Sequence, residues 1–139
     1  MALLFLIGAT NYGDRTAISS VFPLLRSEFN ATDVELGAIG TSFLWAYAMA
    51  SPMAGLFADR FSRSRIVAGS LAAWSLVTLV TAFATSIGQI LVSRVILGFT
   101  EAAYLPAAIA LIADYHSSKT RATAIGLHTA GLTFGLIAG

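Results

Sequence analysis

The stretch that best indicates the fold class is residues 66–85, IVAGSLAAWSLVTLVTAFAT, because these 20 residues contain no charged side chain. An α-helix of about 20 apolar residues is long enough to cross the hydrocarbon core of a bilayer. Similar apolar stretches lie on both sides of this one, so we expect helices at about residues 2–25, 34–57, 66–85, 89–113 and 121–139, the last cut short. The predicted fold class is therefore all-α, a multi-pass transmembrane helical bundle occupying residues 1–139.

The composition also favours a membrane protein. Of the 139 residues, 57% are hydrophobic and only 11% are charged, and the mean hydropathy is +0.80. A soluble domain of this length carries about a quarter charged residues and cannot bury this much apolar surface in a small core. The net charge of +1 argues against nucleic acid as a partner. The chain has no cysteine, which excludes disulfides, zinc–thiolate sites and cysteine nucleophiles, and no cofactor is expected.

The loops differ in charge, and this difference predicts the orientation. Basic residues gather in two of them: Arg60, Arg63 and Arg65 between the second and third helices, and Lys119 and Arg121 between the fourth and fifth. The loops expected on the other side contain only Arg26. Since loops rich in lysine and arginine stay in the cytoplasm, we expect the N-terminus and both basic loops there.

Four ionisable residues fall inside the predicted spans: Asp14, Arg15, Arg94 and Glu101. A charge near the bilayer centre costs at least about 2.5–3.5 kcal/mol. Helical spacing places Asn11 on the same face as Asp14 and Arg15, and it aligns Arg94, Glu101 and Tyr104 along the fourth helix. Two interpretations stay open. The groups form buried salt bridges that hold helices together, or they line an aqueous cavity with acid and base groups on opposing helices.

Small residues indicate where helices approach closely. Gly131, Gly135 and Gly139 recur every four residues in the last stretch, a spacing that favours close packing against a neighbouring helix. Pro106 lacks a backbone N–H group and is expected to kink the fourth helix just after Glu101. We interpret His128 as a hydrogen-bonded packing residue in preference to a proton relay.

The loop at residues 55–65, GLFADRFSRSR, resembles the signature loop of the major facilitator superfamily. Ser62 replaces a glycine of that pattern and Ser64 interrupts its basic pair. The resemblance implies a cytoplasmic gating motif, in which the glycine permits close helix approach and charged side chains close the cytoplasmic side. Its members here are Gly55, Asp59, Arg60 and Arg63, together with Asp114 and Arg121 in the next cytoplasmic loop.

Two further segments resemble the anion:cation symporters and the spinster-like carriers of the same superfamily. They are residues 11–15, NYGDR, and residues 94–102, RVILGFTEA. The resemblance covers essentially the whole chain but only about the first third of such carriers, which have twelve helices in two halves. It implies a partial N-terminal half, whose missing partner is the C-terminal half of the same carrier.

The resemblance also implies roles for the ionisable residues. Asp14 and Glu101 would be proton-coupling sites, and the substrate-binding residues would be Asn11, Tyr12, Arg15, Arg94 and Tyr104. Burial disfavours the charged form of a carboxyl and a nearby arginine favours it, so movement or substrate can shift the balance. The implied function is proton-coupled symport of a small organic anion, a sugar acid or other carboxylate, in the cell or inner membrane. The alternative from the same segments is a spinster-like carrier of lysolipids or amphiphiles.

Other functional classes have less support. The sequence has no His-Glu-x-x-His or Gly-x-Ser-x-Gly motif and no cysteine, so an intramembrane enzyme is not expected. A non-transporting remnant of a carrier is the third class, since a transport pathway runs between two halves. Coding sequence beyond Gly139 would separate the carrier from the remnant.

Overall fold

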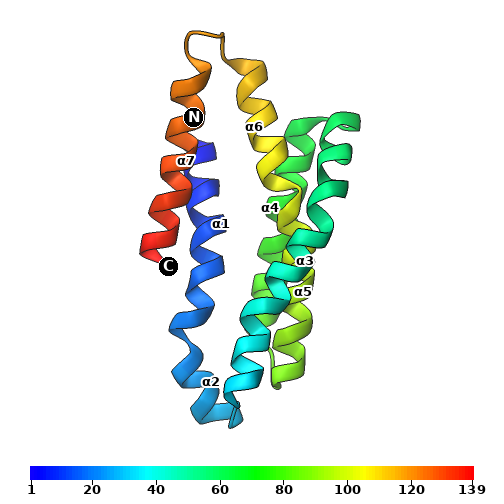
Figure 1. Cartoon of the computed structure of the whole chain (residues 1–139), viewed down its shortest axis with the longest axis vertical. Helices are drawn as coiled ribbons and strands as arrows, with labels where there is room; N and C mark the ends of the chain where they lie inside the picture. The colour runs from blue at the N-terminus through cyan, green and yellow to red at the C-terminus, as the bar shows by residue number, and fades with distance from the viewer. The chain divides into compact units, whose positions relative to one another are not determined.

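The computed structural model describes the backbone of residues 1–139 and the side chains of residues 1–57 and 60–139. In this described part, the regular elements are all α-helices (Figure 1): α1 (Ala2–Ser20), α2 (Phe22–Phe29), α3 (Asp33–Arg60), α4 (Arg63–Thr81), α5 (Ile87–Ala102), α6 (Tyr104–Tyr115) and α7 (Arg121–Ala138). The predicted all-α fold class is thus confirmed.

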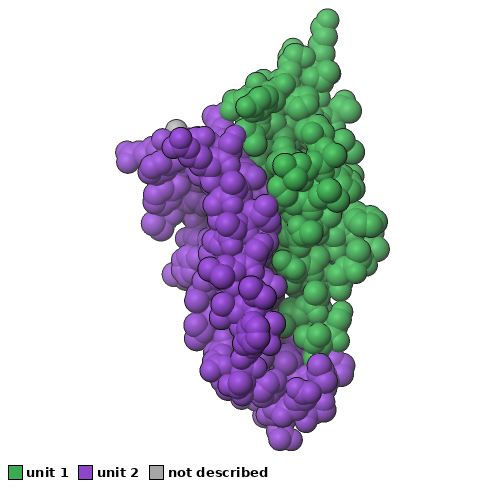
Figure 2. All heavy atoms as spheres, turned by 180° about the vertical axis from the view of Figure 1, so that it is seen from behind, with its two compact units in different colours: residues 1–21, 108–139 green, residues 22–107 purple. Residues whose placement is uncertain are grey.

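The chain divides into two compact units, coloured separately in Figure 2. Unit 1 consists of residues 1–21 and 108–139, and in it α1 packs along α7. Unit 2 consists of residues 22–107, and in it α3 and α4 both pack against α5. The boundary falls within α6. Unit 1 therefore joins the two ends of the chain, whereas unit 2 is one continuous segment.

The first predicted helix, residues 2–25, is divided in the structure. It ends at Ser20, Val21 adopts a non-helical conformation with φ −96° and ψ 1°, and α2 begins at Phe22. Proline has no N–H group to donate to the preceding turn, and it fits well in the first turn of a helix. Pro23 therefore ends α1 and is accommodated at the start of α2.

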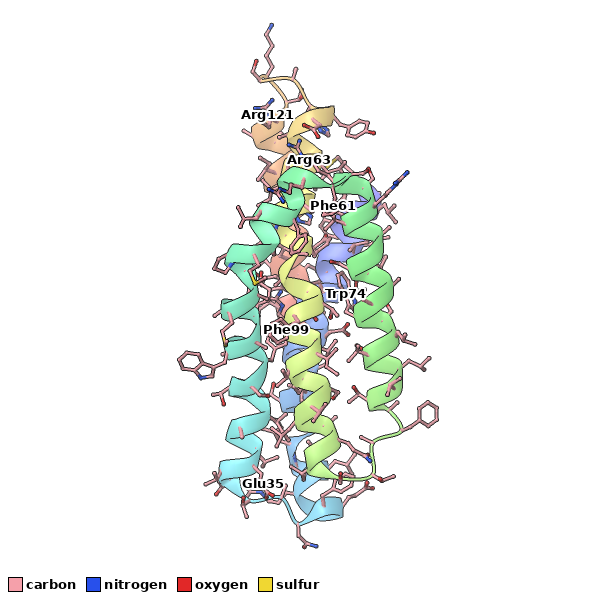
Figure 3. All side chains as sticks on the ribbon, turned by 90° about the vertical axis from the view of Figure 1, so that its right-hand side faces the viewer. Glu35, Phe61, Arg63, Trp74, Phe99 and Arg121 are labelled. Carbon is pink, nitrogen blue, oxygen red and sulfur yellow. The ribbon has the colours of Figure 1, made fainter. Side chains whose placement is uncertain are left out.

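A capping box begins α3. The Thr32 hydroxyl accepts a hydrogen bond from the backbone N–H of Glu35 at 3.3 Å, and the Glu35 carboxylate accepts one from the backbone N–H of Thr32 at 2.8 Å. Arg26 of α2 forms an ion pair with Asp33 beside this cap. Figure 3 shows Glu35 at one end of α3, and Phe61 and Arg63 at the turn that joins its other end to α4.

The fourth predicted helix is also divided. It breaks at Ala103, between α5 and α6, just after Glu101. Pro106 cannot donate the hydrogen bond that the Ala102 carbonyl would otherwise receive, so the helix is interrupted three residues before the proline. The interruption lies just after Glu101, at the point where the sequence predicts a kink.

Two helical segments of the described chain are long and apolar enough to cross a membrane: Arg63–Thr81 and the stretch Ile87–Tyr115. Apolar side chains also point outward, as on α3, where Trp45, Met49 and Met53 recur every four residues and are 71%, 68% and 60% exposed. Soluble monomers rarely expose contiguous apolar surface of this kind. The five predicted spans as a set stay a prediction.

Candidate functional site

The polar segment of α1 is organised around Arg15. Its Nη2 atom donates a hydrogen bond to Oδ1 of Asn11 at 3.2 Å, one turn earlier on the same helix. The guanidinium carbon also lies 4.6 Å from the centre of the Tyr12 ring, within the range of a cation–π interaction. Asn11 is buried with 1% of its surface exposed, and Arg15 is half-buried. The expected common face of Asn11 and Arg15 is therefore present as a direct contact.

Close packing against α7 holds this part of α1. A Cβ atom added to Gly131 would lie 2.6 Å from the carbonyl oxygen of Phe5, and one added to Gly135 or Gly139 would overlap the backbone of Ala9 or Gly13. The two backbones can approach this closely only because α7 carries glycines there. The packing role expected of these glycines is confirmed.

His128 adds a polar contact to the same helix pair. Its Nδ1 atom lies 3.0 Å from the backbone carbonyl oxygen of Leu4, and the side chain is 1% exposed. Because a carbonyl oxygen only accepts hydrogen bonds, Nδ1 is the protonated nitrogen in this contact. A hydrogen-bonded packing histidine is what the sequence predicts at this position, and this contact confirms it.

The second group of ionisable residues lies on α5. Arg94 and Glu101 are 5% and 1% exposed, and Gly98 lies between them. A Cβ atom on Gly98 would lie 2.6 Å from the carbonyl oxygen of Phe43, so α3 passes very close to this turn. The guanidinium carbon of Arg94 lies 5.0 Å from the centre of the Phe43 ring. The sequence pattern identifies Arg94 but not Phe43, because spacing along one helix does not reveal its neighbour.

Tyr104 has a different environment from the one predicted for a substrate-binding residue. It is 0% exposed, and its ring packs edge-on against Trp74 of α4, with ring centres 5.4 Å apart at 84°. Its surface is thus fully used for packing in this conformation. Contact with a substrate would require this packing to open.

Asp14, Arg15, Arg94 and Glu101 all have interaction partners in the structure. Ionised groups away from water persist when partners compensate for the lost hydration. Unit 1 contains Asp14 and Arg15, and unit 2 contains Arg94 and Glu101; in each unit the arginine keeps its charge and the carboxyl can bind a proton. Among the described residues, no cluster of three or more histidine, aspartate or glutamate side chains could hold a metal ion.

The predicted gating motif is only partly described. A Cβ atom on Gly55 would meet nothing within 4 Å in the described part, so the close helix approach expected there is not found. The reason is that Ala50 and Ala54, not Gly55, face the buried cluster around Ala102. The side chain of Asp59 lies outside the described residues.

The other members of the motif flank the two basic loops. Arg60 and Arg121 are exposed, Arg63 is half-buried in the first turn of α4, and Asp114 is exposed near the end of α6. Arg63 and Asp114 both have interaction partners.

A cavity of about 750 Å³ lies between α4 and α5, within unit 2. Apolar side chains such as Leu76, Val80 and Val92 line it, with Gln89 and Ser86 at its loop end. No ionisable side chain of the described residues lines this cavity.

Comparison with known proteins gives a consistent result. The sequence pattern of the Major Facilitator Superfamily matches residues 4–139. The probable galactarate/D-glucarate transporter GudP of Pseudomonas putida is 30% identical over 140 residues, covering 96% of this chain and 31% of that protein. Human protein spinster homolog 1 is 33% identical over 129 residues, covering 91% of this chain and 24% of that protein.

A solved structure shows the same fold. The crystal structure of a bacterial homolog of the human lysosomal transporter spinster, in an inward-facing and occupied conformation, matches with a TM-score of 0.88 and 34% identity. The match covers 95% of this chain and 29% of that one. The chain spans less than a third of the length of these relatives. Its helices, its motifs and these matches agree, and the chain belongs to the major facilitator superfamily of multi-pass membrane transporters.

Proposed function

We propose that this chain provides N-terminal helices of a secondary active transporter that carries a small organic anion together with protons. The observation that supports this most is the burial of Arg94 and Glu101, 5% and 1% exposed, two turns apart on α5. Each charge within a membrane helix costs about 2.5–3.5 kcal/mol, so such residues are usually retained for function. We thus propose that the protein is a carrier and not an enzyme.

The chemistry of the four residues fits this function. Arg15 and Arg94 keep their charge under all physiological conditions and can attract a carboxylate, whereas Asp14 and Glu101 can gain and lose a proton. When a carboxyl takes up a proton, it no longer competes with an anion for the arginine. Proton binding and anion binding then favour each other, as symport requires. The name of GudP, a galactarate/D-glucarate transporter, supports a dicarboxylate sugar acid as the substrate.

The decisive experiment is a paired transport assay on the complete gene product in proteoliposomes. We expect Glu101→Gln to abolish uptake driven by a proton gradient while exchange of substrate between the two sides continues. Arg15→Ala should weaken binding of anions more than binding of neutral compounds. If Glu101→Gln still concentrates substrate with a proton gradient, the proton-coupling role of Glu101 is wrong.

The gating residues carry a second part of the proposal. Asp59 with Arg63, and Asp114 with Arg121, would close the cytoplasmic side and favour an outward-open state, with Gly55 and Arg60 in the same motif. Their position at the helix ends that flank the two basic loops supports this. In the complete gene product, Asp59→Asn should increase cytoplasmic accessibility and slow transport. If the Asp59→Asn variant transports at the wild-type rate, these residues determine the topology only and do not gate transport.

The proposed orientation can be tested with single cysteines. With the N-terminus in the cytoplasm, Cys at Ser62 and Ser118 should react with an impermeant thiol reagent only from the cytoplasmic side, and Cys at Thr32 only from outside. Labelling at position 62 from outside would overturn the orientation.

A spinster-like carrier of lysolipids or amphiphiles is the alternative. The structural match at a TM-score of 0.88 and 34% identity favours it, since that solved protein is a spinster homolog. The two functions differ in their need for Arg15. If Arg15→Ala leaves anion affinity unchanged while an amphiphile is transported, the alternative replaces the sugar-acid carrier.

A further inference from the structure

A groove lined by apolar side chains lies between α4 and α5, and we call it the α4–α5 groove. The two helices lie side by side and are joined by the loop at residues 82–86 (Figure 3). The groove holds the cavity of about 750 Å³ and is bordered by Leu76 and Val80 of α4 and by Val92 and Ile96 of α5. These four side chains are 61%, 60%, 60% and 43% exposed, so the apolar lining is open to its surroundings.

Two hydroxyl groups line the α4–α5 groove but offer it no hydrogen-bond donor. The hydroxyl of Thr81 donates to the carbonyl oxygen of Val77 at 2.7 Å. The hydroxyl of Ser93 donates to the carbonyl oxygen of Ile90 at 2.7 Å. A hydroxyl has a single hydrogen, so both donors are used within their own helices. A ligand that lies along the groove therefore meets mainly hydrocarbon.

The loop end of the groove differs, because Gln89 in the first turn of α5 lies there. Its Oε1 atom accepts hydrogen bonds from the backbone N–H of Thr85 at 2.7 Å and from the Thr85 hydroxyl at 3.3 Å. Since a backbone N–H only donates, the amide atom that faces Thr85 is the oxygen. The NH2 group is then the part of the exposed Gln89 side chain that can donate to a ligand. The groove thus combines an apolar length with hydrogen-bond donors at one end.

The medium around the groove is lipid, because both bordering helices belong to the two described segments that are long and apolar enough to cross a membrane. Water would find few hydrogen-bond partners along the lining. An α-helix about 10–12 Å in diameter fills about 400–600 Å³ per turn, so the cavity has room for less than two turns of one. A membrane span has about five turns. The size of the cavity therefore fits a thin, flexible chain better than another helix.

The rim of the groove also differs from the helix contacts elsewhere in the chain. On α7 and at Gly98 of α5, a glycine lets the neighbouring backbone come close. Helix contacts in membranes favour such small residues. The four bordering side chains are large and branched, and they would hold the backbone of a further helix away. An acyl chain can lie between them.

We propose that the α4–α5 groove binds one acyl chain of a phospholipid from the surrounding bilayer, with the ester oxygens of that lipid accepting hydrogen bonds from the Gln89 amide. Lipid tails are as apolar as leucine, so the hydrophobic effect does not favour the groove over the bilayer. Retention therefore depends on close packing along the chain and on the hydrogen bonds at Gln89. In the proposed orientation the lipid belongs to the outer leaflet. The inference does not depend on which substrate the carrier transports.

The first experiment locates the lipid on the complete gene product in phosphatidylcholine nanodiscs. Phosphatidylcholine with a diazirine in one acyl chain would be added in trace amount and photoactivated, and the labelled residues identified by peptide mass spectrometry. We expect labelling at Val80 and Val92 to exceed labelling at Leu79 several-fold. Leu79 is the matched control, because it lies on α4, is 59% exposed and does not line the groove.

Two results of the labelling would overturn the inference. Equal labelling of Val80, Val92 and Leu79 would mean that lipid surrounds the helices without a site. Labelling of Leu79 alone would mean that another part of the protein covers the groove.

The second experiment counts the phospholipid that stays bound through detergent purification, by native mass spectrometry. Val92→Trp fills the groove, so retention should fall several-fold, whereas Leu79→Trp adds the same side chain outside it and should leave retention unchanged. Gln89→Glu keeps an oxygen acceptor for Thr85 but replaces the NH2 donors with a second oxygen, so retention should also fall several-fold. Wild-type retention in Val92→Trp would overturn the binding site. Wild-type retention in Gln89→Glu would overturn the role of Gln89 in holding the lipid.

Discussion

The two closest helix pairs, α1 with α7 in unit 1 and α3 with α5 in unit 2, achieve close packing with different residues. On α7, Gly131, Gly135 and Gly139 all face the backbone of α1. On α5, the same four-residue spacing is occupied by Arg94, Gly98 and Ala102, and Gly98 meets the α3 backbone. Three glycines thus lie along the contact of α7 with α1, whereas this face of α5 combines one glycine with a charged residue.

The difference shows how a membrane helix can carry a charge within a tight interface. At Gly131, Gly135 and Gly139, the residue that meets α1 has no side chain that could do chemistry. Where α5 has Arg94, the α3 backbone still comes close at Gly98, and the Phe43 ring covers the guanidinium. Close approach at one turn therefore brings an aromatic face within reach of the charge one turn earlier.

The largest effect is expected from Gly135→Ala. The added Cβ atom would overlap the carbonyl of Ala9, and backbone cannot move aside as a side chain can. We expect a loss of about 3 kcal/mol in the free energy of unfolding, at the upper end of the cost of overpacking. The matched control is Gly126→Ala on the same helix, where nothing lies within 4 Å. Equal melting temperatures of the two variants in detergent would show that the glycine packing is dispensable.

A smaller effect is expected from Gly98→Ala, where α5 approaches the backbone of α3. The new Cβ atom would lie 2.6 Å from the Phe43 carbonyl oxygen and 2.7 Å from the Ala46 Cβ atom. We expect about 2 kcal/mol of destabilisation. Ala46→Gly should restore part of it by removing one of three clashes, the third being with the backbone nitrogen of Tyr47 at 2.9 Å, as measured by thermal unfolding. Absence of any rescue would place the whole cost at the backbone of Phe43 and Tyr47.

The contribution of the Phe43 ring to holding Arg94 can be isolated with a double-mutant cycle. Phe43→Leu and Arg94→Met, alone and combined, should give a coupling energy of about 1 kcal/mol, typical of a partly desolvated cation–π contact. Phe99→Leu, at a side chain that is 50% exposed on the same helix as Arg94, is the control and should show no coupling. A coupling energy near zero would mean that Phe43 only fills space.

The smallest effect is expected at His128. His128→Phe keeps a ring of similar size and removes the hydrogen bond to Leu4, and interhelical hydrogen bonds in membranes contribute about 0.6 kcal/mol on average. Thermal unfolding should therefore shift much less than in Gly135→Ala. A loss as large as that of the glycine variant would mean that unit 1 depends on polar contacts as much as on packing.

Several features could be predicted from sequence because they depend on residues close together in the chain. The glycine spacing on α7, the break after Glu101 and the contact of Asn11 with Arg15 all follow from the period of a helix or from the chemistry of proline. The all-α class follows from apolar run length. Each of these features depends on the local sequence, and each is present in the structure.

Other features could not be predicted because they depend on which helix lies opposite. Tyr104 packs edge-on against Trp74, 30 residues earlier in the sequence, and spacing along one helix does not reveal this neighbour. Phe43 is one of nine phenylalanines, and nothing in its sequence context distinguishes it as the partner of Arg94. Gly55 matches a family motif, yet its neighbours along α3 form the contact surface instead.

The pairing of α1 with α7 also has a consequence for how the protein is made. The Leu4–His128 contact joins residues 124 positions apart, so α1 enters the bilayer long before its partner has been synthesised. At about 5–20 residues per second, the delay on the ribosome is about 6–25 s. All of unit 2 is translated within that interval. During this time α1, with Asp14 and Arg15, must be retained by lipid or by the insertion machinery. We therefore expect the insertion of α1 to be the step of biogenesis at which quality control acts most strongly.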